Sequence, residues 1–130
     1  MMILIFGGYY QGKLAYALEK SSMTESDVYG CSEHDAITPS GQKIIYELDK
    51  WLLALVKEGL DTDKEVEKLI AKNSDAIVIC NDISCGIVPI DRELRKWRES
   101  VGKALTRLAR ESGEVIRVFC GIPTILKEKL

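Results

Sequence analysis

The residues best suited to chemistry lie near the start of the chain, in the segment GGYYQGKL. Gly7 to Lys13 fit G-x-x-x-x-G-K, a pattern in which loop N–H groups and the lysine surround a phosphate group. The next residue is usually a serine or threonine whose hydroxyl binds magnesium, but here it is Leu14. A glycine-rich turn that binds nothing is the alternative. The predicted phosphate-binding residues are Gly7, Gly8, Tyr9, Tyr10, Gln11, Gly12, Lys13 and Leu14.

A second polar segment, NDISCGIVP at residues 81–89, follows a continuous apolar run. Asp82 comes directly after that run, where a carboxylate would lie near the end of a buried strand. We interpret Asp82 as the acidic candidate of the site, and a capping or loop role is the alternative.

Two apolar runs predict the strands that position these segments. Residues 2–6 and 76–80 are short, apolar and bounded by glycine or polar residues, as expected for central parallel strands. Residues 26–31 and 114–120 predict two further strands, and residues 124–130 predict a short C-terminal edge strand. In parallel sheets ligands bind at the carboxyl ends of the strands, where both polar segments lie.

Three helices are predicted from apolar periodicity. The first covers residues 40–59, with Ser40 as N-cap, Gly59 as stop and no strand within it. Glu47 and Asp49 would then be solvated helix residues. Thr62 and Glu65 have capping-box spacing for a second helix, and a long third helix ends at Gly113. Alternating strands and helices predict a three-layer α/β fold with a mostly parallel sheet and right-handed crossovers.

Length and composition narrow the class of protein. The 130 residues predict one domain, and 18 basic against 20 acidic residues offer no broad basic surface for nucleic acid or anionic membranes. We find no basic leader and no apolar run long enough to cross a bilayer, so a cytoplasmic protein is expected. Four cysteines without a C-x-x-C pair and a single histidine predict reduced thiols and no metal site.

Both ends of the chain resemble the adenosylcobinamide kinase/adenosylcobinamide-phosphate guanylyltransferase family of cobalamin biosynthesis. The family begins with G-G-x-x-x-G-K-S and later carries N-E-V-G-x-G-I-V-P before an arginine-containing helix. The matching residues in the second segment are Asn81, Asp82, Gly86, Ile87, Val88 and Pro89, followed by Arg95, Arg98 and Gly102. The resemblance implies a P-loop NTPase-like domain, homo-oligomeric assembly, GTP or ATP as substrate, and adenosylcobinamide as a further ligand.

The resemblance also implies two reactions, phosphorylation of adenosylcobinamide and GMP transfer through a guanylylated histidine. Lys13 and Asp82 are the residues that match the kinase reaction, whereas Leu14 gives no reason to expect magnesium. The single histidine, His34, lacks the arginine-rich surroundings of the family's histidine, so we favour a surface-loop role. The sequence thus predicts a nucleotide-binding cobalamin-biosynthesis protein, and a catalytically degenerate binding or assembly protein is the alternative.

Overall fold

The computed structural model describes residues 1–83 and 91–128, and all structural statements below concern these residues. A short 3₁₀ turn covers Glu25–Asp27. The strands are β1 (Ile3–Gly7), β2 (Val28–Gly30), β3 (Ile44–Tyr46), β4 (Ile77–Asn81), β5 (Glu114–Phe119) and β6 (Ile122–Lys127). The helices are α1 (Lys13–Ser21), α2 (Leu48–Lys57), α3 (Thr62–Lys72) and α4 (Arg92–Glu111).

The described strands form one sheet in the order β2-β3-β4-β1-β5-β6. β1 pairs in parallel with β4 and β5, and β3 pairs in parallel with β2 and β4. β6 alone runs antiparallel, as the edge neighbour of β5. The predicted mostly parallel sheet with a C-terminal edge strand is confirmed, whereas the narrower P-loop NTPase assignment stays a prediction.

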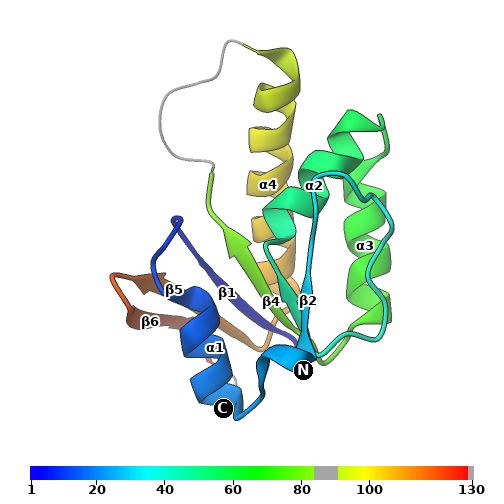
Figure 1. The fold of residues 1–130 in the computed structure, drawn as a ribbon. Coiled ribbons are helices and arrows are strands. Elements are labelled where there is room, and N and C mark those ends of the chain that lie inside the picture. The colour runs from blue at the N-terminus through cyan, green and yellow to red at the C-terminus, as the bar shows by residue number, and fades with distance from the viewer. Residues whose placement is uncertain (84–90, 129–130) are drawn as a thin grey trace.

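Helices cover both faces of the sheet, which gives three layers (Figure 1). On one face, α2, α3 and α4 pack against alternate strand residues such as Leu4, Val78 and Val115. On the other face, Ala17 of α1 packs against Ile5, and Ile79 and Ile116 join the same cluster. Because β4 lies inside the sheet and is covered on both faces, all five of its residues are buried.

The predicted helix over residues 40–59 is wrong in its first half. Ile44–Tyr46 form strand β3, the backbone turns at Glu47 with a φ of 58°, and α2 begins only at Leu48. Ile44 and Ile45 are fully buried between β2 and β4, and a short buried strand cannot be told from a helix by periodicity alone. Ser40 is therefore not the N-cap of this helix. Gly59, with a φ of 69°, does follow its last turn as predicted.

The N-terminus of α3 also differs from the prediction. Its N-cap is Asp61, whose carboxylate accepts a hydrogen bond from the Lys64 N–H at 3.2 Å. Glu65 does not close a capping box with Thr62, because its carboxylate accepts a hydrogen bond from the Thr38 hydroxyl at 2.7 Å. Glu65 thus ties the loop that precedes β3 to α3.

The remaining elements follow the sequence predictions. β1, β2, β4, β5 and β6 are strands, and the long helix α4 ends two residues before Gly113. Trp51 of α2 is buried in the core. Within the described ranges, none of the helices combines the length and the apolar character that crossing a membrane would require.

Candidate phosphate-binding site

The glycine loop joins β1 to α1 at the carboxyl edge of the sheet. Gly7 has a φ of 153° and lies so close to β5 that a Cβ atom would collide with the carbonyl oxygen of Val118. Gly12 is the N-cap of α1, with a φ of 88° in the left-handed region. Glycine suits both positions because it tolerates positive φ and close backbone approach. The loop therefore has the shape that brings backbone N–H groups together at a helix N-terminus.

Neighbouring elements hold this loop in place. The Cys120 N–H donates to the Gln11 side-chain oxygen at 2.6 Å, and the Gly121 N–H donates to the Gln11 carbonyl at 2.9 Å. On the β4 side, the Asp82 N–H donates to the Gly7 carbonyl at 2.8 Å. The turn between β5 and β6 and the end of β4 thus fix the two ends of the loop.

Lys13 is the buried cation of the site. Its side chain is only 5% exposed, and its ammonium group donates to the carbonyl of Gly8 within the loop. Burial lowers the pKa of Lys13, while the charge of Asp49 acts in the opposite direction. A lysine that bonds to its own loop can transfer that bond to a phosphate oxygen, which is a stronger, charged acceptor.

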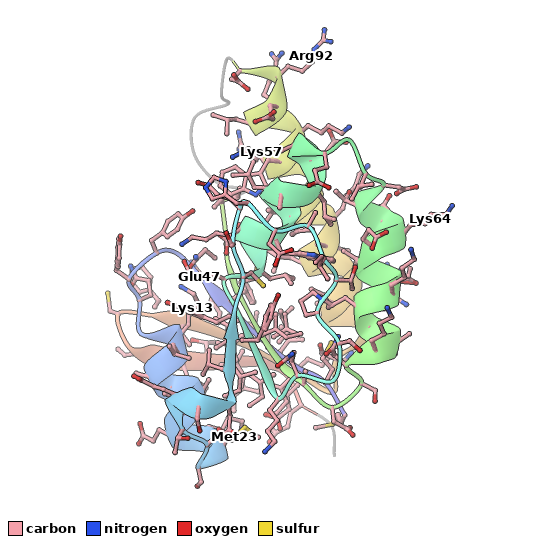
Figure 2. The ribbon with its side chains drawn as sticks, turned by 45° about the vertical axis from the view of Figure 1, so that its right-hand side comes forward. Lys13, Met23, Glu47, Lys57, Lys64 and Arg92 are labelled. Carbon is pink, nitrogen blue, oxygen red and sulfur yellow. The ribbon has the colours of Figure 1, made fainter. Side chains whose placement is uncertain are left out.

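A cavity of about 320 Å³ opens beside Lys13. It combines the glycine loop with the ends of two strands, so Glu47 after β3 and Asn81 at the end of β4 face the same space as Lys13. Figure 2 shows Lys13 and Glu47 next to each other. The Glu47 carboxylate also pairs with Lys50 at 3.0 Å. The lining residues are Tyr9, Tyr10, Gln11, Gly12, Lys13, Leu14, Ala15, Tyr46, Glu47, Lys50 and Asn81.

The prediction that Glu47 and Asp49 are solvated helix residues is wrong. Glu47 lies at the carboxyl end of β3 and lines the cavity, because the segment before it is a strand and not a helical turn. Asp49 is fully buried in the first turn of α2. Burial raises the pKa of Asp49, while hydrogen bonds from Asn81 act in the opposite direction. Sequence analysis missed both residues, although an acidic residue directly after the strand-favouring residues Ile44, Ile45 and Tyr46 was a usable signal.

The two tyrosines of the loop differ in their surroundings. Partial burial and the nearby negative charge of Asp49 raise the pKa of Tyr9 to about 12. Tyr10 has a φ of 58° and its side chain is fully exposed. Their ring centroids are 6.2 Å apart at an interplanar angle of 42°. Tyr9 is therefore partly shielded, at 45% exposed, whereas Tyr10 is fully exposed to solvent.

The other predicted site residues are spread over the chain. Asp82 lies beside Gly7 through its backbone but is not among the described residues that line the cavity. His34 is largely exposed and lies 3.5 Å from Glu33, which in turn pairs with Lys57 in the last turn of α2. The Lys13 cavity lies at the other end of this helix, because Glu47 and Lys50 at the start of α2 line it. The motif residues Gly86 to Pro89 lie outside the described residues.

The residues that line the Lys13 cavity provide few oxygen ligands for a divalent cation. Leu14 lines the cavity with a hydrocarbon side chain, and Asp49 is buried and already hydrogen-bonded. Glu47 is the carboxylate that faces the cavity, and magnesium prefers several oxygen ligands in octahedral geometry. Across residues 1–83 and 91–128, no cluster of three or more histidine, cysteine, aspartate or glutamate side chains could hold a metal ion. These residues do not fit a protein-held magnesium site.

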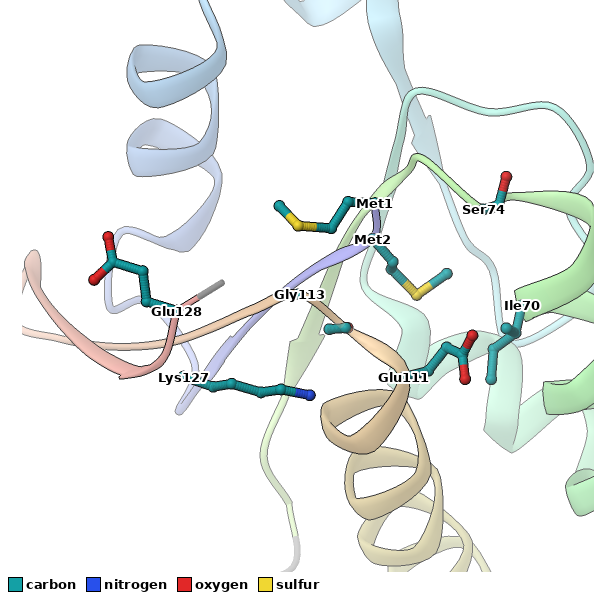
Figure 3. A pocket seen from close by; sticks show the side chains of 9 residues that line it. Met1, Met2, Ile70, Ser74, Glu111, Gly113, Lys127 and Glu128 are labelled. Atoms are coloured by element: carbon teal, nitrogen blue, oxygen red, sulfur yellow. The ribbon is translucent and has the colours of Figure 1, made fainter. Parts of the chain in front are cut away.

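A larger cavity, about 480 Å³, lies at the opposite edge of the sheet (Figure 3). Its lysine, Lys127, donates to the carbonyls of Ala109 and Arg110 at 3.0 Å each and so binds the last turn of α4. Two carboxylates, Glu111 and Glu128, also line it. Among the described residues that line this cavity there is no glycine loop, and the two carboxylates do not suit a phosphate group.

Fold and site together define an α/β domain with a lysine-containing glycine loop at the carboxyl edge of its sheet. Comparison with family models matches residues 34–126 to the family described as cobinamide kinase / cobinamide phosphate guanyltransferase. The match covers more than half of the chain, so the protein belongs to this family of cobalamin biosynthesis. A search of curated proteins gave no match. The matched segment includes Glu47, Asp49 and Asn81, whereas the glycine loop precedes it.

Proposed function

We propose that this protein binds the phosphates of GTP or ATP at its glycine loop, as the nucleotide-binding step of a cobinamide kinase reaction. The observation that supports this most is the buried Lys13 in a cavity shared by the loop and two strand ends. The family uses nucleotide substrates in general, which agrees with such a ligand. The proposed contacts are the N–H groups of the loop, the α1 N-terminus and the Lys13 ammonium.

Phosphoryl transfer needs positioned charge more than covalent chemistry. In the reaction, the hydroxyl oxygen of the cobinamide side chain attacks the terminal phosphorus, and the bridging oxygen leaves with the nucleoside diphosphate. In this proposal Lys13 offsets charge on the transferred group, and the Glu47 carboxylate, which lines the same cavity, accepts the hydroxyl proton. When bound with the nucleotide, magnesium would neutralise further phosphate charge.

The second candidate function is a catalytically degenerate relative that binds nucleotide without turning it over. Leu14 in place of a loop hydroxyl and the sparse donor set for magnesium favour it. The strand that we expected to be missing is present as β3, and this removes one argument for degeneracy. Guanylyl transfer has weaker support than either candidate, because His34 lies on an exposed loop and not in the cavity lining.

Calorimetric titration with GTP, ATP and adenosylcobinamide, each with and without magnesium, tests the proposal. We expect triphosphate binding that depends little on magnesium. A parallel assay for phosphorylated adenosylcobinamide separates the two candidates, since only the kinase produces it. Failure to bind any of the three ligands at millimolar concentration would contradict both.

We also propose that the protein forms a homo-oligomer. The hairpin of β5 and β6 exposes apolar side chains at the edge of the sheet, beside the exposed Arg117 whose guanidinium lies 5.9 Å from the Phe119 ring centroid, and an open edge strand can pair with another chain. The exposed residues of this surface are Phe119, Ile122, Ile125 and Leu126. Light scattering should return a mass above 14.6 kDa at micromolar concentration, and Ile125→Lys should reduce it. A monomeric mass for the unaltered chain would refute the assembly.

A further inference from the structure

Lys50 is a second lysine of the Lys13 cavity, and the nucleotide-binding step proposed above does not use it. It lies in the first turn of α2 and lines the cavity together with Glu47. Lys13 follows β1 at the start of α1, whereas Lys50 follows β3. Because β4 lies between β1 and β3 in the sheet, the two lysines reach the cavity from elements that follow the two neighbours of β4. Asn81, at the end of β4, lines the same cavity.

The two lysines differ in what holds them. Lys13 is buried, and its ammonium group donates to the carbonyl of Gly8. The Lys50 side chain is 44% exposed, and its ammonium group pairs with the Glu47 carboxylate at 3.0 Å. A partly exposed ion pair between residues three apart contributes little to stability, so it breaks at little cost. The flexible Lys50 side chain can therefore exchange Glu47 for a phosphate oxygen.

The charge that a phosphate ligand needs here has no evident source in a protein-held metal ion. Leu14 has no hydroxyl, and the residues that line the cavity do not fit a magnesium site. A nucleoside triphosphate carries several negative charges, and phosphoryl transfer depends on positioned positive charge. Among the described residues that line the cavity, Lys13 and Lys50 are the two cations.

We propose that Lys50 is the second phosphate-binding cation of the site, and that it supplies charge for which other glycine loops use a metal ion. This inference rests on the phosphate-binding function proposed above. Without ligand, the Lys50 ammonium group stays paired with Glu47. When a diphosphate or triphosphate enters, the ammonium group moves to a phosphate oxygen. The Glu47 carboxylate then loses its partner in this pair and is free to accept the hydroxyl proton.

The first test compares two lysines at opposite ends of the same helix. Lys57, in the last turn of α2, is 36% exposed, pairs with Glu33 at 3.6 Å and is not among the described residues that line the cavity. Each variant is titrated by calorimetry with inorganic pyrophosphate and with GTP, both without magnesium. Lys50→Gln should bind about tenfold more weakly than the unaltered protein, because a charge-assisted contact is lost. Lys57→Gln should bind as the unaltered protein does, and Lys50→Arg should keep most of the affinity because it keeps the charge.

The outcomes of these titrations separate the inference from the proposed function. Equal affinity of Lys50→Gln and Lys57→Gln would overturn the role of Lys50 and leave phosphate binding at the loop intact. If the unaltered protein binds neither pyrophosphate nor GTP, the proposed function fails and the inference fails with it. Thermal unfolding of the variants checks that a loss of binding is not a loss of fold.

The second test follows the two lysines in the unaltered protein. Reductive methylation with formaldehyde and a borohydride labels accessible lysine amines, and mass spectrometry measures the rate at each position. Saturating pyrophosphate should slow the labelling of Lys50 several-fold, because its amine is then bound to phosphate, and should leave Lys57 unchanged. If pyrophosphate binds and the labelling rate of Lys50 stays the same, Lys50 does not contact the ligand and the inference is wrong.

Discussion

The two cavities at opposite edges of the sheet differ in chemistry more than in size. The larger, about 480 Å³, is lined by Met1, Met2 and two carboxylates, and its lysine is bound to α4 carbonyls. The smaller, about 320 Å³, contains a buried lysine whose ammonium bonds to its own glycine loop. The smaller cavity is therefore the candidate site, because its groups converge on one class of ligand.

The difference follows from the direction of the strands. At the carboxyl edge, β1, β3 and β4 end near one another, so Lys13, Glu47 and Asn81 line one cavity although they are far apart in sequence. At the amino edge, the strands begin and the last turn of α4 is capped by Lys127. Parallel sheets place ligand sites at the carboxyl edge for this reason.

The strongest test of the difference between the two cavities is to remove one lysine from each of them. Lys13→Ala removes a charge-assisted contact worth roughly 1.5 to 3 kcal/mol, so pyrophosphate and GTP should bind about tenfold more weakly or worse. Lys127→Ala should leave affinity unchanged and lower the free energy of unfolding by about 1 kcal/mol, through lost bonds to α4. Calorimetry and denaturant unfolding measure the two effects. Equal loss of binding in both variants would remove the distinction between the cavities.

The next largest effect is on the free energy of unfolding, and it compares one glycine at each edge of the sheet. Gly7→Ala places a Cβ against the Val118 backbone at a positive φ, and should lower the free energy of unfolding by roughly 1 to 3 kcal/mol. Gly113→Ala meets only the flexible end of Met1 at the other edge, so its cost should stay below about 1 kcal/mol. Thermal and denaturant unfolding compare the variants. A larger loss in Gly113→Ala would mean that the loop is not the constrained region.

Leu14→Ser tests the role of magnesium at the glycine loop, because it introduces the hydroxyl that the G-x-x-x-x-G-K-[ST] pattern has at this position. Because that hydroxyl adds an oxygen ligand for magnesium, GTP affinity in the variant should rise a few-fold when magnesium is added. Affinity of the unaltered protein should change little. Titrations of both proteins with and without magnesium check this, with Leu18→Ser in α1 as a control for the loss of an apolar side chain. Strong magnesium dependence of the unaltered protein would show that another residue supplies the missing ligand.

The smallest expected effect concerns His34. Incubation with GTP labelled on its α-phosphate should give no acid-labile protein adduct, because the imidazole lies on an exposed loop outside the cavity lining. His34→Ala should therefore behave as the unaltered protein. A labelled band that disappears in His34→Ala would restore guanylyl transfer as an activity.

Sequence patterns predicted most of the strands and helices. Of the candidate site they predicted the glycine loop and Lys13, but not Glu47 or Asp49. β1, β4, β5 and α4 follow from long apolar runs and clear helical stripes. β3 was missed because Ile44 and Ile45 continue the helical pattern of Leu48 and Trp51. With β3 missing, Glu47 and Asp49 could not be placed in the site.

The glycine loop and Lys13 were predictable because a local pattern encodes them. The rest depends on tertiary contacts: the buried Asp49 accepts hydrogen bonds from Asn81 and Trp97, which come from distant segments. No local pattern carries that information.

The most direct test of the central claim is a nuclear magnetic resonance titration of the labelled protein with GTP and with pyrophosphate. Binding in the Lys13 cavity predicts that the amide signals of residues 8–14 and of Asn81 shift with either ligand and saturate together. The amides of residues 111–113, in the other cavity, should stay in place. Shifts confined to residues 111–113, or no shifts at millimolar ligand, would contradict the claim that the glycine loop binds phosphate.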